Sequence, residues 1–176
     1  TERIVPQKVR VKQSDSMCRN MQALKIGNIV SDSIINMYYA YDNCRNLTTT
    51  ICGDKVTDMT YAYKNCSNLT MAACGPNVID MYGTYLNCVN LTTAVCGPNV
   101  TSMFSAYANC KNLTTAVCGD NVTNMAYAYS NCTSLTTAVC GPNVTHMYGA
   151  YYGCTNLTTA ICGNGIIHMD NAYQGC

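Results

Sequence analysis

The sequence predicts a repeat solenoid in which each coil has a short β-strand on one face and a short helix on the other. Three observations carry this prediction. The chain of 176 residues repeats with a period of 22 over most of its length. The first part of each unit alternates inward and outward positions as a strand does, and the second part has the apolar spacing of a helix. A unit this short cannot bury its own apolar face, so consecutive units must stack.

Cysteines mark the period, because each unit places two of them at fixed positions. The first cysteine column contains Cys44, Cys66, Cys88, Cys110, Cys132, Cys154 and Cys176. The second cysteine column contains Cys52, Cys74, Cys96, Cys118, Cys140 and Cys162. Cys18 lies 26 residues before Cys44, as expected for a first unit with a four-residue insertion.

The strand is predicted at the start of each unit, for which residues 91–111 serve as the example. Alternation makes Leu91, Ala94 and Cys96 the side chains expected to point inward. The pair Gly97 and Pro98 then ends the strand, because both residues favour turns. Glycines at positions 53, 75, 119 and 141 predict the same turn in other units.

The helix is predicted in the second half of each unit. Met103, Ala106, Tyr107 and Cys110 have relative positions 0, 3, 4 and 7, which is one face of a two-turn helix. A residue that caps helices well precedes the methionine in five units: Asn36, Asp58, Asp80, Ser102 and Asn124. We expect one tyrosine column to be half buried with its hydroxyls in water: Tyr41, Tyr63, Tyr85, Tyr107, Tyr129, Tyr151 and Tyr173.

A strand and a short helix in each coil are typical of leucine-rich repeats. Residues 121–136, with copies at 55–70 and 143–158, resemble the BspA-like leucine-rich repeats of bacterial surface proteins. The resemblance covers residues 34–176 and implies a right-handed β/α coil. It further implies a role in adhesion or protein binding, a possible place in bacteriophage structural proteins, and no shared active site. The chain departs from the family in its shorter unit and in the cysteine at the last strand position.

The chain is expected to divide into two parts. Residues 1–16 predict an N-terminal capping strand, and residues 17–176 a solenoid of about seven units whose first rung is irregular. Because a solenoid needs a polar cap at each end and none is visible after Cys176, we expect the last rung to be covered by further repeats, another domain or a subunit.

Composition excludes several classes of function. Charged residues make up 11% of the chain and the net charge is +1, which argues against nucleic-acid binding. No apolar run approaches the roughly 20 residues that span a bilayer. No Ser-His-Asp or Cys-His arrangement supports catalysis, so we expect neither an enzyme nor a cofactor.

The cysteines and histidines favour structural roles over metal binding. Both cysteine columns fall on inward positions, where the simplest interpretation is small hydrophobic side chains in a narrow core. Disulfides between rungs stay open as an alternative, whereas spacings of 8 and 14 do not suit a zinc site. His146 and His168 share one column, so they could share a metal, but no carboxylate column accompanies them and we expect a surface substitution.

The surface offers two candidate binding regions. The strand face should present a column of mostly threonines beside an aliphatic column without charge, although β-branched residues also simply suit a sheet; its residues are Thr49, Met71, Thr93, Thr115, Thr137, Thr159, Ile51, Ala73, Val95, Val117, Val139 and Ile161. A secondary aromatic patch is expected on the helical side: Tyr38, Tyr39, Tyr61, Tyr82, Tyr127 and Tyr148.

These features predict a non-enzymatic binding or adhesion module of a bacterial surface or secreted protein. Its strand face would contact a protein or a glycan. The alternative is a structural or receptor-binding component of a phage virion, in which the uncharged stripe would be buried between subunits. An ice-binding solenoid is a remote third possibility, because adjacent threonines such as Thr92 and Thr93 should point to opposite sides of a strand.

Overall fold

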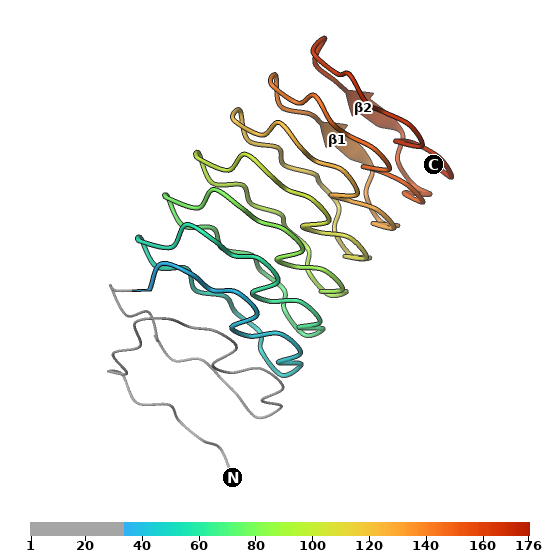
Figure 1. The fold of residues 1–176 in the computed structure, drawn as a ribbon. Helices are drawn as coiled ribbons and strands as arrows, with labels where there is room; N and C mark the ends of the chain where they lie inside the picture. The colour runs from blue at the N-terminus through green and yellow to red at the C-terminus, as the bar shows by residue number, and fades with distance from the viewer. Residues whose placement is uncertain (1–33) are drawn as a thin grey trace.

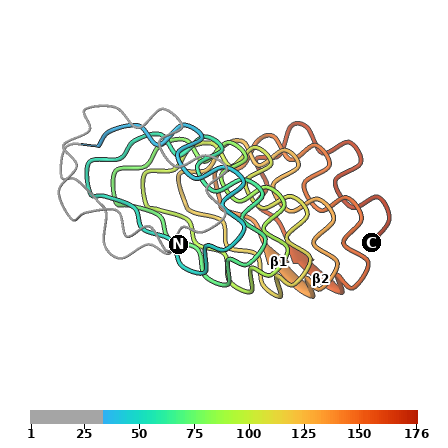
Figure 2. The same ribbon diagram turned by 90° about the horizontal axis from the view of Figure 1, so that it is seen from below.

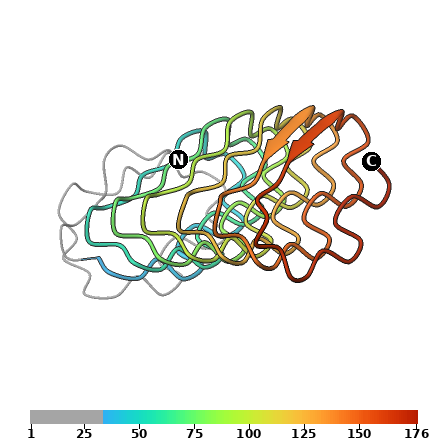
Figure 3. The same ribbon diagram turned by 90° about the horizontal axis from the view of Figure 1, so that it is seen from above.

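The chain forms a stack of similar coils that follow one another from residue 34 to the C-terminus. A computed structural model describes residues 34–176. Successive coils lie side by side in three perpendicular or opposite views (Figures 1, 2 and 3). Isolated parallel bridges join residues 22 apart, for example Asn36 with Asp58 and Asp58 with Asp80. The 22-residue period of the sequence is therefore one turn of the stack. The capping strand predicted for residues 1–16, and Cys18, lie outside the described residues.

Two short strands are the regular secondary structure of residues 34–176. Strand β1 (Thr137–Val139) pairs in parallel with strand β2 (Thr159–Ile161), with Ala138 opposite Ala160. Figure 1 shows them in neighbouring coils at the C-terminal end. In earlier coils the same position forms only single bridges, such as Met71 with Thr93. We call this side, with residues 91–96 and their equivalents, the strand face.

The helix predicted for residues 103–110 is absent from the structure, which has no helix within residues 34–176. The reason lies in the backbone hydrogen bonds. The N–H groups of Met103 and Tyr107 donate to carbonyls of the next coil, those of Asn124 and Ala128. Alternate N–H groups, such as that of Ala106, donate to the residue three positions earlier. This ribbon of turns buries the same positions as a two-turn helix, so the apolar spacing cannot tell the two apart.

The residues predicted to cap a helix instead bond the backbone at the start of these turns. Asp58 Oδ1 accepts a hydrogen bond from the N–H of Thr60 at 2.8 Å, and Asn124 Oδ1 accepts one from Ala126 at 3.0 Å. The residues that open the sequence pattern of a helix therefore begin a turn. We call residues 103–110 and their equivalents the turn side.

Asparagines stabilise the turn side in two ways. Asn65, Asn87 and Asn109 have φ between 62° and 65°, a left-handed conformation that asparagine tolerates well. Their side chains also bond one another between coils: Nδ2 of Asn87 donates to Oδ1 of Asn65 at 2.8 Å, and Nδ2 of Asn109 donates to Oδ1 of Asn87 at 2.8 Å. The asparagine column thus links neighbouring coils.

The core is a single strip along the stack. Leucine, valine, methionine, alanine, tyrosine and cysteine each contribute one column; in one coil these are Leu91, Val100, Met103, Ala106, Tyr107 and Cys110, all fully buried. In the last coil the equivalent side chains are more open, since Met169 is 50% exposed whereas Met147 is fully buried. No helix among residues 34–176 has the length and hydropathy to cross a membrane.

Candidate binding surface

The strand face presents the two side-chain columns that the alternation predicted. The column of mostly threonines is exposed throughout, and includes Met71 at 60% exposure. In the aliphatic column, Ile51, Ala73 and Val95 are half buried, whereas Val117, Val139 and Ile161 are exposed. No charged residue occupies either column. The surface is therefore polar but uncharged on one side and apolar on the other.

Tyrosine hydroxyls hold this face in place from inside the core. The hydroxyl of Tyr107 accepts a hydrogen bond from the N–H of Val95 at 3.0 Å and donates one to the carbonyl of the same residue. The same two hydrogen bonds recur in three further pairs: Tyr63 with Ile51, Tyr85 with Ala73, and Tyr129 with Val117. Each tyrosine thus satisfies both backbone groups of one residue of the aliphatic column.

The expectation that this tyrosine column is half buried is wrong for Tyr41 to Tyr151, which are buried, and is confirmed only for Tyr173. Tyr63, Tyr85, Tyr107, Tyr129 and Tyr151 are fully buried, and neighbouring rings stack with centroids 5.3–5.6 Å apart. The hydroxyls of Tyr63, Tyr85, Tyr107 and Tyr129 need no water because the backbone supplies a donor and an acceptor. That of Tyr151 lies 3.7 Å from Sγ of Cys140. Burial raises the pKa of each of these phenols well above its usual value.

The two cysteine columns differ in burial and direction. In the first column, Cys66 to Cys154 are completely buried, and each thiol donates to the backbone carbonyl of a tyrosine 25 residues earlier, at 3.0–3.2 Å. In the second column all described members except Cys140 are only half buried. Burial raises the pKa of the second-column thiols Cys52, Cys74, Cys96 and Cys118 to about 11. These four thiols are therefore mostly protonated at neutral pH.

Glycine after the second cysteine column is required by packing. A Cβ added at Gly97 would lie 2.9 Å from Sγ of Cys74 in the preceding coil, and one at Gly119 would lie 2.9 Å from Sγ of Cys96. Each sulfur therefore occupies the space that a side chain at the next glycine would need. The sequence pair Cys-Gly reflects contact between coils as well as a turn.

The aromatic patch lies on the turn side and is more compact than the sequence indicates. Tyr38 is 42% exposed and Tyr148 is 38% exposed, while the other four members are half buried. Phe104, which sequence reasoning omitted, belongs to the same row, since its ring stacks on that of Tyr82 with centroids 4.7 Å apart. Most of these ring surfaces contact one another, which leaves less of them free for a ligand.

Glycines make room for two of the patch tyrosines. Gly83 and Gly149 have φ of 55° and 56°, and a Cβ at either would collide with the ring of Tyr61 or Tyr127. The ring of Tyr61 covers Gly83 and meets Tyr82 edge to face at 5.1 Å. A signal for this packing was present in the sequence, because a glycine follows each of these tyrosines by 22 residues.

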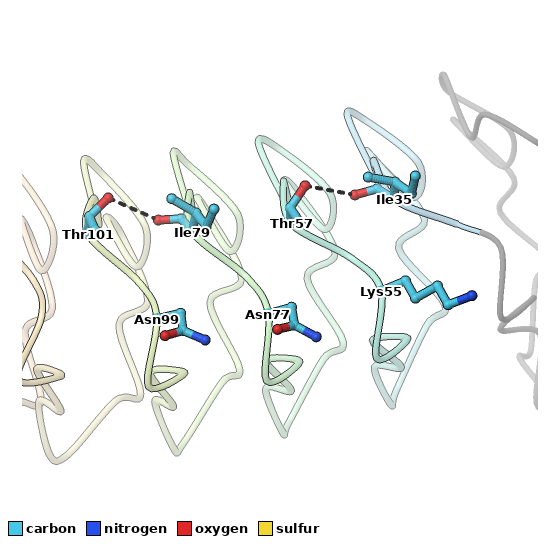
Figure 4. A pocket seen from close by; sticks show the side chains of 7 residues that line it. All are labelled: Ile35, Lys55, Thr57, Asn77, Ile79, Asn99 and Thr101. Carbon is cyan, nitrogen blue, oxygen red and sulfur yellow. Dashed lines mark hydrogen bonds between the residues drawn. The ribbon is translucent and has the colours of Figure 1, made fainter.

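An open groove runs along the flank between the strand face and the turn side. It has a volume of about 590 Å³ and is shown in Figure 4; its lining residues are Ile35, Lys55, Thr57, Asn77, Ile79, Asn99 and Thr101. Its polar groups already bond between coils, for example Nδ2 of Asn99 to the carbonyl of Pro76 at 2.8 Å. Ile35 and Ile79 remain 55% and 49% exposed. Sequence reasoning missed this groove, although its isoleucines and threonines flank the buried valine column.

The two histidines occupy the position of Asn36 and its equivalents in the last two coils, a column that we call the capping column. Their ring centroids are 4.7 Å apart, and both side chains are exposed. Nδ1 of His146 is 2.9 Å from the hydroxyl of Thr145. Across residues 34–176, no three histidine, cysteine, aspartate or glutamate side chains come close enough to hold a metal ion. The pair therefore lacks the third ligand that a protein metal site needs.

Comparison with known proteins defines the class to which this solenoid belongs. The profile of the BspA type leucine rich repeat region matches residues 14–105 and 81–176, with six copies. The chain therefore belongs to this leucine-rich repeat family, which confirms the resemblance drawn from residues 121–136. No curated protein sequence matches the chain.

Three solved structures share the fold. A leucine-rich repeat protein from Bacteroides ovatus is 13% identical, with a TM-score of 0.53 over 98% of this chain and 63% of that one. The leucine-rich repeat protein of T. pallidum is 15% identical, with a TM-score of 0.58 over 90% and 67%. A leucine rich cell surface protein from Faecalibacterium prausnitzii is 18% identical, with a TM-score of 0.52 over 90% and 34%. This chain thus spans about two thirds or less of each neighbour.

Proposed function

We propose that this chain is a non-enzymatic binding module of a bacterial surface or secreted protein, which contacts a protein or a glycan through its strand face. The observation that carries the proposal is the uncharged, partly apolar strand face. Met71 in the threonine column and Val117, Val139 and Ile161 in the aliphatic column are 41–60% exposed. Exposed apolar stripes on repeat proteins commonly mark interfaces.

Two further points support this choice. The tyrosine hydroxyls bond the backbone behind the aliphatic column, so the surface is held in one shape before a partner arrives, and this lowers the entropy cost of binding. A structural neighbour is described as a leucine rich cell surface protein. A surface location agrees with that description.

Substitutions on the strand face test the proposal. The double variant Val117→Lys and Val139→Lys places two charges in the aliphatic column, whereas Pro98→Lys and Pro142→Lys add the same charge at exposed turns. Binding to immobilised mucin, collagen and laminin is measured by biolayer interferometry, with mucin also tested after enzymatic removal of its glycans. We expect the wild type and the proline variants to bind at least one probe, and the valine variant to lose that binding about tenfold or more.

Two results would contradict the proposal. One is equal binding by the wild type and the valine variant, since the strand face would then not be the contact surface. The other is an obligate trimer in solution that binds none of the probes, which would favour the alternative of a phage structural subunit with this face buried between copies.

A further inference from the structure

Cys140 and Cys162 differ from the rest of the second cysteine column in where their sulfurs point. Their Sγ atoms are 3.2 Å apart, and both are free thiols. In the coils of Cys52, Cys74 and Cys96 the sulfur instead lies 3.7–3.8 Å from the carbonyl oxygen of the glycine that follows it.

The packing against glycine confirms this difference in direction. A Cβ at Gly97 would meet the sulfur of the preceding coil's second-column cysteine, as described above. At Gly163 the three nearest atoms to such a Cβ are backbone atoms of Pro142 and Gly141, and Sγ of Cys140 is not among them. The sulfur of Cys140 has therefore left the position beneath the next glycine.

Strand pairing accounts for the close approach. Val139 lies opposite Ile161 in the parallel register of β1 and β2, and the N–H of Cys140 donates to the carbonyl of Ile161 at 2.9 Å. Adjacent strands are about 4.8 Å apart. This spacing lies within the Cα separation of roughly 4.4–6.8 Å that a disulfide needs. The two sulfurs, 3.2 Å apart, need to approach by about 1.2 Å to reach the roughly 2.0 Å length of an S–S bond.

We propose that Cys140 and Cys162 form a reversible disulfide that staples the two C-terminal coils, and that a small organic disulfide is the oxidant. The thiolate of Cys162, the more accessible of the two, attacks one sulfur of the oxidant and releases one thiolate. Cys140 then loses its proton to solvent and attacks Sγ of Cys162, which releases the second thiolate. Two protein thiols are oxidised and one oxidant disulfide is reduced to two thiols.

The surroundings fit these roles. Cys140 is 8% exposed, and burial raises the pKa of its thiol to about 12, so it is not the thiol that attacks the oxidant first. It can take part in the second step because its Sγ already lies 3.2 Å from that of Cys162. The hydroxyl of Tyr173 lies 2.7 Å from Sγ of Cys162, close enough to donate to a thiolate there. The first-column thiols of the same two coils, Cys132 and Cys154, are fully buried, and each donates to a backbone carbonyl of the preceding coil.

Oxidation with glutathione disulfide under native conditions, followed by alkylation and chymotryptic peptide mapping, tests the proposal. Cleavage after tyrosine and leucine places Cys118, Cys140 and Cys162 in separate peptides, 114–127, 136–148 and 158–173. We expect a cross-link between the second and third peptides, loss of both thiols from the alkylated pool, and continued alkylation of Cys118. Dithiothreitol should restore both thiols.

Matched variants complete the test. Cys162→Ser should leave Cys140 alkylated, whereas Cys96→Ser, in the same column, should leave the cross-link unchanged. Two outcomes would overturn the proposal: full alkylation of Cys140 and Cys162 after oxidation, or cross-links spread equally over neighbouring pairs such as Cys96–Cys118 and Cys118–Cys140. Because the readout is the wild-type peptide map, it does not depend on whether a variant folds or on any binding partner.

Discussion

In the coils that contain Ile51, Ala73, Val95 and Val117, a tyrosine hydroxyl bonds the backbone N–H and C=O of the strand-face residue. At the C-terminal end, β1 and β2 pair directly with each other. There the hydroxyl of Tyr151 lies 3.7 Å from Sγ of Cys140 instead. The repeat sequence is nearly the same in both regions, so one motif supports two ways of satisfying the same backbone groups.

This difference indicates why the strand face has few regular strands: tyrosine hydroxyls from the core bond its backbone. A hydroxyl that bonds both the N–H and the C=O of a residue occupies its only backbone donor and one lone pair of its acceptor. Neighbouring coils accordingly form only isolated bridges on this face. Where the hydroxyl of Tyr151 contacts Sγ of Cys140 instead, β1 and β2 pair, and the Sγ atoms of Cys140 and Cys162 lie 3.2 Å apart. The following predictions run from the largest expected effect to the smallest.

We call the pair of hydrogen bonds from a tyrosine hydroxyl to one strand-face residue a tether. High pH should destabilise the tethered coils and the paired coils alike, because burial is the main cause of the raised pKa values of their tyrosines and cysteines. The pKa of the buried phenols is raised well above its usual value, and that of Cys96 is raised to about 11. The unfolded chain ionises first, near pH 8.5 for cysteine and 10 for tyrosine. The stability that these groups contribute is full below those values and is lost as the pH rises through the folded pKa values. Urea midpoints in the presence of a reductant should fall between pH 8 and pH 11, and equal midpoints would contradict the account.

Tyr107→Phe should break the tether in one coil. It removes the hydroxyl partner of both the N–H and the C=O of Val95, at an expected cost of about 2–3 kcal/mol. Tyr151→Phe is the matched control in the paired region, where the hydroxyl contacts only a thiol, and should cost about 1 kcal/mol or less. Urea unfolding of the two variants compares them; similar losses would remove the distinction between the regions.

Gly83→Ala and Gly149→Ala should show that the turn side, unlike the strand face, is the same at both ends of the stack. Each glycine is in a left-handed conformation beneath a tyrosine ring, so each alanine should cost about 1–3 kcal/mol. Replacing Tyr61 by Ser in the Gly83→Ala chain should recover part of the loss, because the ring collision disappears. Thermal unfolding measures both effects, and a neutral Gly83→Ala would contradict the packing described.

His146→Asn should slightly increase the stability of the C-terminal coils by restoring the hydrogen bond made by Asn124 in an earlier coil. In an earlier coil Asn124 accepts a hydrogen bond from the N–H of Ala126, whereas His146 contacts the hydroxyl of Thr145. An asparagine can accept the N–H of Tyr148 in the same manner, for a gain of about 0.5–1 kcal/mol. A lower thermal midpoint in this variant would argue against the capping role of the column.

The periodicity of the sequence predicted the coils and the direction of their side chains, but not the partners of the backbone hydrogen bonds. The 22-residue spacing identified the coils, and alternation placed Thr93 outward and Leu91 inward. The spacing of Met103, Ala106 and Tyr107 shows which side chains are buried but not which carbonyl each N–H reaches, so it indicated a helix where the structure has turns bonded between coils.

The candidate surfaces show the same limit. The exposed residues of the strand face follow from alternation, whereas the tethering role of Tyr107 depends on a contact 12 residues away that no local pattern reveals. Phe104 was left out of the aromatic patch because a search for tyrosines does not include it. The meeting of Cys140 and Cys162 depends on strand pairing that is absent from coils of similar sequence.

Amide hydrogen exchange of Val95 and Val117 in the wild type and in Tyr107→Phe tests the tether most directly. The account predicts that the variant loses protection at Val95, whose N–H donates to the missing hydroxyl, while Val117 keeps its bond to Tyr129 and its protection. Unchanged protection at Val95, or an equal loss at both amides, would contradict the claim that each tyrosine hydroxyl holds one residue of the strand face.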